Sequence, residues 1–411
     1  MAGMGTLGIN GLGRIGKLTV WYEVAAGRFD RLVVNPGRPI GKGLDAAAHY
    51  LSVDSTYGSL GRFLHGHAGP REVVKIVDRE KGWLEIDGVR VEVLTENRNP
   101  KDIGWADHNA RLVVDTTGRF RDPTLPPDQP GGSLQGHLES GAKLVLVSSA
   151  FKIKDTTATQ PDDSVMLIYG INQQAFDPAV HCMVSAASCT TTALAHMMLP
   201  LLQHELTHRM LTASMSTIHA ATNSQSVLDS VPKTGAKDLR KNRSVLNNII
   251  LTSTNAAAAL EVVMPEISSI GFLADSVRIP TSTASLIILN CTFQSKLDAG
   301  GASEINRASV NQIYADYGAD PESGVLFTED QNVSTDLIGE LAAVAIEGWE
   351  THARTGFTRV DLSALGIDSD VGVVEVPVTH LKLFGWYDNE LGSYTKRMSQ
   401  LCHYIADRSG L

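Results

Sequence analysis

The stretch LGINGLGRIG, residues 7–16, decides the fold of the N-terminal part of the chain. Its first four residues predict a short strand, and the residues that follow it, Lys17–Ala26, predict a helix. Gly11 permits a tight turn, Gly13 lets the backbone approach a pyrophosphate, and Gly16 allows the helix to pack closely on the strand. The helix N-terminus offers N–H groups and a partial positive charge to an anion. We therefore predict a phosphate-binding cradle; the alternative is a glycine turn in an unrelated α/β protein.

Further short strands are predicted across the first half of the chain. Runs such as Leu112–Val114 and Leu144–Val147 are apolar throughout, which is typical of strands buried on both faces of a parallel sheet. The proline-rich segment Asp122–Gly132 is predicted to be a surface loop. The predicted strands of this half are Leu7–Asn10, Arg31–Asn35, Val73–Val77, Arg90–Leu94, Leu112–Thr116, Lys143–Ser148 and Val165–Tyr169.

The pattern changes after Val184–Thr192, where a strand gives way to a helix that begins near Cys189. Ser285–Gln294 and Gly372–Phe384 alternate between apolar and polar residues, which is typical of a mixed or antiparallel sheet with one exposed face. Helices are predicted over Leu246–Val263, Glu340–Trp349 and, near the chain end, Ser393–Asp407.

Length and composition suit two globular domains. The chain has 411 residues, of which 43% are hydrophobic and 19% charged, as is ordinary for proteins with full cores. We predict an α/β Rossmann-type dinucleotide-binding domain over residues 1–188, completed by a C-terminal helix within residues 388–411. A second, α+β domain with a mixed or antiparallel sheet is predicted over residues 189–387.

Composition also disfavours several classes of partner and site. No apolar run approaches the ~18 residues that a membrane span needs, and Met1–Leu7 has no basic region ahead of a hydrophobic stretch. We therefore expect a cytoplasmic protein that does not bind membranes. The formal net charge of −10 gives no reason to expect a nucleic-acid partner. The four cysteines form no Cys-x-x-Cys pair and the histidines no His-Glu-x-x-His spacing, so no metal is expected.

One cysteine, Cys189, lies where its thiolate would be favoured. Serine and threonine, which are strong helix caps, flank it at the predicted helix start, and a helix N-terminus can lower the pKa of a thiol substantially. The segment Ser214–Ala220 predicts a strand that delivers His219 at its end. A Cys–His pair is the minimum for nucleophilic catalysis by a thiol. From these residues alone, the alternatives are a buried inert cysteine and an unrelated histidine.

Four segments resemble the signatures of the glyceraldehyde-3-phosphate dehydrogenase family, in the family's order and at near-family spacing. They are Gly8–Gly16, Ala187–Thr191, Met215–Ala220 and Trp386–Glu390. Weaker matches lie between them, at Asp54–Gly58, Thr117–Phe120, Gly170–Asn172 and Arg278–Thr281. The resemblance covers nearly the whole chain.

The resemblance implies a phosphorylating aldehyde dehydrogenase that oxidises glyceraldehyde 3-phosphate with NAD or NADP and inorganic phosphate. Cys189 would form a thioester with the substrate, and His219 would act as its general base. Residues matching those that hold the attacking phosphate are Ser188, Thr190 and Thr254, and those matching the site for the substrate's own phosphate are Thr222 and Arg278. The cofactor residues it implies are Gly11, Gly13, Arg14, Ile15, Gly16, Asn35, Thr117, Gly118 and Asn389. It also implies a homotetramer.

The chain departs from the family pattern where cofactor choice is decided. Pro36 stands where the family usually has an aspartate that binds the adenosine ribose, and Arg38 lies close by. The preference between NAD and NADP therefore stays open. Further departures are Ala186, Thr192, Asn255, the rewritten segment Ser230–Asn247 and extra residues between Lys296 and Leu341.

Other readings differ in substrate or in class. A related dehydrogenase for another sugar-phosphate aldehyde, such as erythrose 4-phosphate, would use the same residues. A catalytically weak binding protein of the same fold is disfavoured because Cys189, His219 and Arg278 are all present. A thiol hydrolase would leave the glycine cradle and Asn389 unexplained.

Overall fold

The computed structural model describes residues 5–70, 72–368 and 370–411, which form two compact units. One unit comprises the chain up to Cys189 together with Glu390–Leu411, and the other comprises Thr190–Asn389. Residues 1–4, which begin the predicted first domain and the segment considered for a secretory signal, lie outside the described residues. No helix among the described residues is both long enough and apolar enough to cross a membrane.

The first unit is built on one sheet whose strand order is β10-β11-β9-β8-β1-β2-β7-β6-β5. Its strands are β1 Thr6–Asn10, β2 Arg31–Asn35, β5 Val74–Asp78, β6 Trp83–Ile86, β7 Val89–Val93, β8 Ala110–Asp115, β9 Leu144–Val147, β10 Ser164–Met166 and β11 Met183–Ser185. Neighbours from β10 through β7 pair in parallel. The prediction of a parallel, doubly wound sheet is confirmed for this part.

The prediction of parallel pairing is wrong at one edge, because β5, β6 and β7 pair antiparallel. The β6 strand, which was not predicted, alternates between buried and partly buried residues. Asp87 and Gly88, between β6 and β7, have φ values of 47° and 85°. Two adjacent residues with positive φ are the signature of a tight hairpin turn, which reverses the chain.

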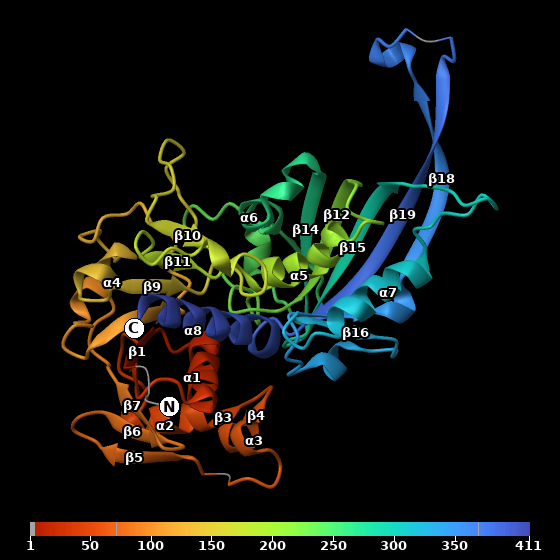
Figure 1. The fold of residues 1–411 in the computed structure, drawn as a ribbon. Helices are drawn as coiled ribbons and strands as arrows, with labels where there is room; N and C mark the ends of the chain where they lie inside the picture. The colour runs from red at the N-terminus through yellow and green to blue at the C-terminus, as the bar shows by residue number, and fades with distance from the viewer. Residues whose placement is uncertain (1–4, 71, 369) are drawn as a thin grey trace. The chain divides into compact units, whose positions relative to one another are not determined.

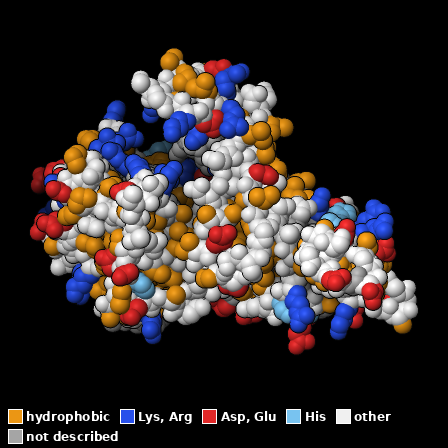
Figure 2. Space-filling view, turned by 90° about the horizontal axis from the view of Figure 1, so that it is seen from above, with side chains coloured by type: hydrophobic (Ala, Val, Ile, Leu, Met, Phe, Trp, Pro, Cys, Tyr) orange, Lys and Arg blue, Asp and Glu red, His pale blue; other side chains and the backbone are white. Residues whose placement is uncertain are grey.

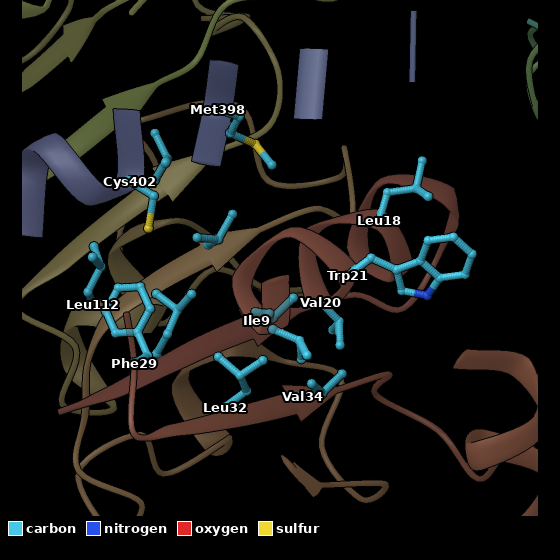
Figure 3. Packing of buried hydrophobic residues seen from close by; sticks show 14 of the residues in the cluster. Ile9, Leu18, Val20, Trp21, Phe29, Leu32, Val34, Leu112, Met398 and Cys402 are labelled. Carbon is cyan, nitrogen blue, oxygen red and sulfur yellow. The ribbon is translucent and has the colours of Figure 1, made fainter. Parts of the chain in front are cut away.

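The described residues of the first unit pack into two hydrophobic cores, and Figure 3 shows the larger of them. Ile9, Leu32 and Leu112 come from three adjacent strands of the sheet, and Trp21 and Cys402 pack there from α1 and α8. The predicted final helix begins as a π-helical turn, Leu391–Lys396, and continues as α8. The helices are α1 Arg14–Ala26, α2 Leu44–Ser52, α3 Leu60–His65, α4 Gln135–Glu139 and α8 Arg397–Ser409, and a small ribbon pairs β3 Val53–Asp54 with β4 Gly58–Ser59.

The second unit has a mixed sheet with the order β13-β14-β12-β15-β19-β17-β16, and β18 pairs with β19 outside this path. The α+β prediction is therefore confirmed. The strands are β12 Met210–Ala220, β13 Ile250–Thr252, β14 Gly271–Ile279, β15 Ser285–Gln294, β16 Val325–Thr328, β17 Val344–Glu347, β18 His352–Asp361 and β19 Val373–Tyr387. The helices are α5 Cys189–Gln203, α6 Ala256–Val263 and α7 Arg307–Gly318 (Figure 1).

Two predicted helices are wrong in whole or in part. The first half of Leu246–Val263 is not helical, because Asn247 adopts a left-handed φ of 58° and the chain then enters β13. The segment Glu340–Trp349 contains β17, whose residues are buried throughout. A short apolar run buried on all sides has no periodicity that separates strand from helix, and the β-branched Val344 and Ile346 favour the strand.

Candidate active site

The glycine loop has the geometry that its sequence predicts. Gly11 has a φ of 97°, and its N–H donates to the carbonyl of Asn35 over 2.8 Å. A Cβ atom on Gly16 would lie 2.1 Å from the Gly11 carbonyl oxygen, so only glycine allows this packing. A Cβ on Gly13, directly before α1, would meet no atom of the described residues within 4 Å apart from its chain neighbours. The loop thus leaves room beside the helix N-terminus, where a pyrophosphate fits.

Arg14, the first residue of α1, directs its side chain to protein carboxylates. Its guanidinium contacts Asp54, and its Nε donates to Glu390 over 3.1 Å. Partial burial lowers the pKa of Arg14, but the hydrogen bond and charge of Glu390 outweigh it and the pKa is raised overall. The group of Arg14 that faces the cradle is therefore its backbone N–H. Ile15, beside it, packs on the core.

Asn35 and Thr117 shape the loops around the cradle through buried hydrogen bonds. The Asn35 amide donates to Asn10 Oδ1 over 2.9 Å. Asp115, at the end of β8, accepts from the backbone N–H of Thr117 over 3.0 Å and from its hydroxyl over 2.6 Å. Gly118 follows with a φ of 62°. The Asn10 amide donates to Asp115 over 2.7 Å and the Thr116 hydroxyl donates to the Gly11 carbonyl over 2.9 Å, which holds the loop after β8 next to the loop after β1.

Asp115 is itself held by a histidine. His137 Nε2 lies 3.0 Å from Asp115 Oδ2, and Trp105 Nε1 donates to His137 Nδ1 over 2.9 Å. Because an indole N–H can only donate, the ring proton of His137 must lie on Nε2 and point at the carboxylate. Sequence reasoning missed this network. Asp115 could have been found from the sequence, because it ends an apolar strand and directly precedes Thr-Thr-Gly.

A cavity of about 460 Å³ lies beside the end of β2, next to the cradle. Its lining includes Asn35, the β7 end at Leu94, and Arg79 and Lys81 from the turn after β5. Arg38, the cation that the sequence suggested for a 2′-phosphate, is exposed. Glu80 and Glu96 also line the cavity, and Arg79 pairs with Asp45, so charges of both signs lie around the region where the adenosine half of a dinucleotide would bind.

Cys189 is the first residue of α5, as predicted. The turn from β11 into the helix passes through Ala187, whose φ of 53° is left-handed. The Ala187 N–H donates to Ser185 Oγ over 3.1 Å, and its carbonyl accepts from Tyr394 Oη over 3.3 Å. Strained backbone conformations that the surrounding structure holds in place are frequent at functional sites. Ser188 then places Cys189, which is partly exposed, in the first helical turn, where the helix dipole favours thiolate.

The other cysteines are in settings that suppress their reactivity. Burial and the neighbouring Asp163 raise the pKa of Cys182 to about 12. Burial also raises the pKa values of Cys291 and Cys402. At neutral pH these three thiols stay protonated, and the thiolate is the nucleophilic form.

In the second unit, His219 and Arg278 lie side by side. They are register partners near the ends of the parallel strands β12 and β14, and the guanidinium contacts the imidazole Nδ1. Burial, and then the positive charge of Arg278, lower the pKa of His219 to about 3. The imidazole is therefore neutral at neutral pH. Its Nδ1 also lies 2.8 Å from the Ala220 carbonyl, so Nδ1 faces both a donor, the guanidinium, and an acceptor. The tautomer with the proton on Nδ1, directed at the carbonyl, is the one that would make Nε2 a proton acceptor.

Asn389 is buried at the end of β19, and its amide orientation is fixed. Ser285 Oγ accepts from the Ala220 N–H over 3.0 Å and donates to Asn389 Oδ1 over 2.8 Å. The Nδ2 group of Asn389 is then the donor that faces away from Ser285. A carboxamide oxygen accepts hydrogen bonds, so the Nδ2 group of Asn389 has the polarity to bind one.

The remaining predicted phosphate ligands are spread over the second unit. The Thr190 hydroxyl is buried and lies 3.0 Å from the hydroxyl of Tyr387, which also bonds Thr217 over 2.8 Å. Thr222 begins the loop after β12, and its hydroxyl donates to Gln225 over 3.1 Å. Thr254 Oγ1 accepts from the backbone N–H of Ala256 at the start of α6. Tyr387 was missed from sequence, although it belongs to a matched segment.

Comparisons with known proteins agree with this geometry. The family described as glyceraldehyde 3-phosphate dehydrogenase, NAD binding domain, matches residues 5–123, and the corresponding C-terminal domain matches residues 188–389. A glyceraldehyde-3-phosphate dehydrogenase of Kitasatospora aureofaciens is 30% identical over 98% of this chain and 100% of its own. The chloroplastic glyceraldehyde-3-phosphate dehydrogenase GAPCP1 of Arabidopsis thaliana is 31% identical, covering 98% of this chain and 79% of its own. This chain therefore belongs to the glyceraldehyde-3-phosphate dehydrogenase family.

Proposed function

We propose that this chain is a phosphorylating aldehyde dehydrogenase that oxidises glyceraldehyde 3-phosphate with NAD(P) and inorganic phosphate. The observation that carries the proposal is the placement of Cys189 at the first turn of α5, behind the strained Ala187. The names of the relatives support the substrate, and the glycine cradle supports the cofactor.

The proposed chemistry begins at the thiolate of Cys189, which adds to the aldehyde carbonyl, and the oxyanion so formed takes a proton from water to give a hemithioacetal. His219, neutral in the free enzyme, takes the hydroxyl proton as the carbon loses hydride, and a thioester remains on Cys189. Bound NAD(P) supplies the acceptor for that hydride. An oxygen of inorganic phosphate then attacks the thioester carbonyl, the thiolate leaves, and an acyl phosphate is released.

Arg278 is proposed to bind the phosphate group of the substrate, together with Thr222. A guanidinium binds phosphate with two parallel hydrogen bonds. Because the charge of Arg278 lowers the pKa of His219, an anion bound to Arg278 would raise that pKa. Substrate binding would thus make His219 a stronger base at the moment when a base is needed. Ser188, Thr190 and Thr254 are proposed to hold the attacking phosphate.

The cradle residues Gly11 to Gly16 would hold the pyrophosphate of NAD(P), with Asn35, Thr117 and Gly118 shaping the loops beside it. Asn389 would donate to the nicotinamide carboxamide. We further propose a homotetramer, which sedimentation tests, and a cytoplasmic location, which fractionation tests.

The proposed function is tested with a panel of phosphorylated and unphosphorylated aldehydes, each assayed with and without inorganic phosphate. Reduced nicotinamide is followed by its absorbance. We expect the highest kcat/KM for glyceraldehyde 3-phosphate, and rapid turnover only when phosphate is present. A higher kcat/KM for erythrose 4-phosphate would reassign the substrate. Turnover that does not depend on phosphate would contradict the phosphorylating mechanism.

Arg278→Ala should weaken binding of phosphorylated substrates selectively. A hydrogen bond to a charged group contributes about 1.5–3 kcal/mol, so KM should rise roughly 10- to 100-fold for glyceraldehyde 3-phosphate. KM for unphosphorylated glyceraldehyde should change little. The exposed Arg243, which pairs with Asp229, offers a matched control in Arg243→Ala. An equal rise in KM for both aldehydes would show that Arg278 does not bind the phosphate.

The cofactor preference should respond to a carboxylate at position 36. Pro36 carries no charge that would repel a 2′-phosphate, so we expect the protein to use NAD and NADP within about a hundredfold of each other, or about 2.7 kcal/mol. Pro36→Asp should shift the ratio of specificity constants towards NAD, and Arg38→Ala should weaken NADP binding. A preference for NAD well beyond a hundredfold in the unmodified protein would overturn this expectation.

A further inference from the structure

A series of buried hydrogen bonds runs along the carboxyl edge of the first unit's sheet, across strands that are neighbours in the order β8-β1-β2-β7. It links the last residues of β8, β1 and β2, which are Asp115, Asn10 and Asn35, to the segment after β7. The Asn10 Nδ2 group donates to Asp115 over 2.7 Å. The Asn35 Nδ2 group donates both to Asn10 Oδ1 and to the Asn97 carbonyl, each over 2.9 Å. We call this series the edge network.

The edge network begins at the carboxylate of Asp115, which is fully buried, whereas many charged side chains lie on the surface, as Figure 2 shows for one face. Its Oδ1 accepts from the N–H and the hydroxyl of Thr117. Its Oδ2 accepts from Asn10 and from His137 Nε2. Trp105 fixes the tautomer of His137 that donates, because the indole N–H occupies Nδ1. All four of these groups therefore donate to one carboxylate.

An ionised carboxylate accepts hydrogen bonds and cannot donate them, so it orients each amide of the edge network in turn. The Nδ2 group of Asn10 must face Asp115, which leaves its Oδ1 for the amide of Asn35. The Oδ1 of Asn35 is thereby turned to the Gly37 N–H, which donates to it over 3.1 Å. Gly37 has a left-handed φ of 68° in the turn after β2. The charge of Asp115 thus fixes, two side chains away, how the turn of Pro36 and Gly37 is held.

The far end of the edge network lies where the proposed cofactor would bind. Asn35 and Asn97 both line the cavity of about 460 Å³ beside the end of β2. Arg38, the cation suggested for a 2′-phosphate, directly follows the turn that the edge network holds. His137 and Trp105 are fully buried, so they can act on a cofactor only through the groups that they hold.

We propose that Asp115 is a positioning residue for the cofactor: held by His137 and Trp105, it sets the shape of the site for the adenosine half of NAD(P). This role rests on the proposed function, since it requires a dinucleotide at the glycine cradle. Hydrogen bonds in a series polarise one another, and a buried donor without an acceptor costs free energy. Loss of the carboxylate should therefore loosen both the loop of Thr117 and the turn of Gly37.

Asp115→Asn replaces one carboxylate oxygen by a group that can only donate, so it places a donor against donors. We expect the dissociation constants of NAD and NADP to rise roughly tenfold or more, measured by titration of the protein fluorescence. The kcat at saturating cofactor should stay within about threefold of the unmodified value.

Glu23→Gln is the matched control for this substitution. Glu23 is also a buried carboxylate, bonded to Ser399 and His403, but it lies near the end of α1 that is far from the cradle. Both substitutions should lower the melting temperature, because each disturbs a buried polar network. Only Asp115→Asn should change the two dissociation constants.

A second pair of variants keeps the carboxylate in place. His137→Gln retains an N–H group that can donate to Asp115, whereas His137→Leu has none. We expect the dissociation constant of NAD to stay within about threefold in His137→Gln and to rise roughly tenfold in His137→Leu. Equal dissociation constants in the two variants, with unequal melting temperatures, would show that the histidine is structural only.

Hydrogen exchange tests the edge network without any cofactor. The segments that hold the amides of Gly37 and Thr117 should exchange roughly tenfold faster in Asp115→Asn, and at the unmodified rate in Glu23→Gln. Dissociation constants that Asp115→Asn and His137→Leu leave unchanged would overturn the proposal, whatever the exchange rates. An unmodified protein that bound neither NAD nor NADP would overturn the proposed function and this role together, which is a different result from normal binding in every variant.

Discussion

Replacing Cys189 by serine should abolish dehydrogenase turnover, by on the order of 10⁴-fold or more in kcat. A serine hydroxyl is far harder to ionise than a thiol, so the hemithioacetal would not form at a useful rate. Binding of NAD(P) and thermal unfolding should stay nearly unchanged, because the substitution exchanges one small atom at a partly exposed position. Steady-state kinetics, cofactor titration and thermal denaturation measure the three quantities.

The same prediction has a chemical readout. Iodoacetamide should label Cys189 faster than Cys182, because burial and Asp163 raise the pKa of the Cys182 thiol to about 12. Cys182→Ser is the matched control and should retain turnover. Appreciable turnover by Cys189→Ser, or preferential labelling of another cysteine, would contradict the covalent mechanism.

The parts of the site that sequence predicted are those fixed by local geometry. A positive φ at Gly11, the close approach at Gly16 and the start of α5 at Cys189 are set by residues within a few positions of one another. Their signatures are therefore contiguous in the sequence. The bounds of β15 were also predicted, from the alternating pattern of Ser285–Gln294.

What sequence could not predict depends on partners far apart in the chain. Tyr387 bonds Thr190 across 197 positions, and Asn10 bonds Asp115 across 105. No local pattern marks such pairs. The strand β18 was missed for a related reason: alternation predicted much of β19, but β18 carries a mixture of polar and apolar residues whose pairing the register reveals.

His219→Asn tests the base and its coupling to Arg278. We expect kcat/KM to fall 10²- to 10⁴-fold, the usual contribution of general acid–base catalysis. Asparagine is close to imidazole in size but cannot take a proton at neutral pH, so folding should be preserved. His208→Asn, at an exposed position of the same unit, should leave kcat/KM unchanged.

The pH dependence sharpens this test, because kcat/KM reports the pKa values of the free enzyme. Burial and Arg278 lower the pKa of His219 from its ordinary 6.5 to about 3 in the folded protein. The base therefore remains unprotonated as the pH falls from 7 to 5. In the unmodified enzyme, the pH profile of kcat/KM should show no inflection near 6.5 that comes from His219. His219→Asn should lower kcat/KM without changing the shape of that profile between pH 5 and 7. In the unfolded chain the same group protonates near 6.5, so its burial should cost stability progressively as the pH falls from 6.5 towards 3.

Arg278→Lys keeps a positive charge and should keep the pH profile of kcat/KM, whereas Arg278→Ala should raise the pKa of His219. An inflection near 6.5 in the unmodified enzyme, lost in His219→Asn, would show that the imidazole is not held neutral by Arg278 and its burial.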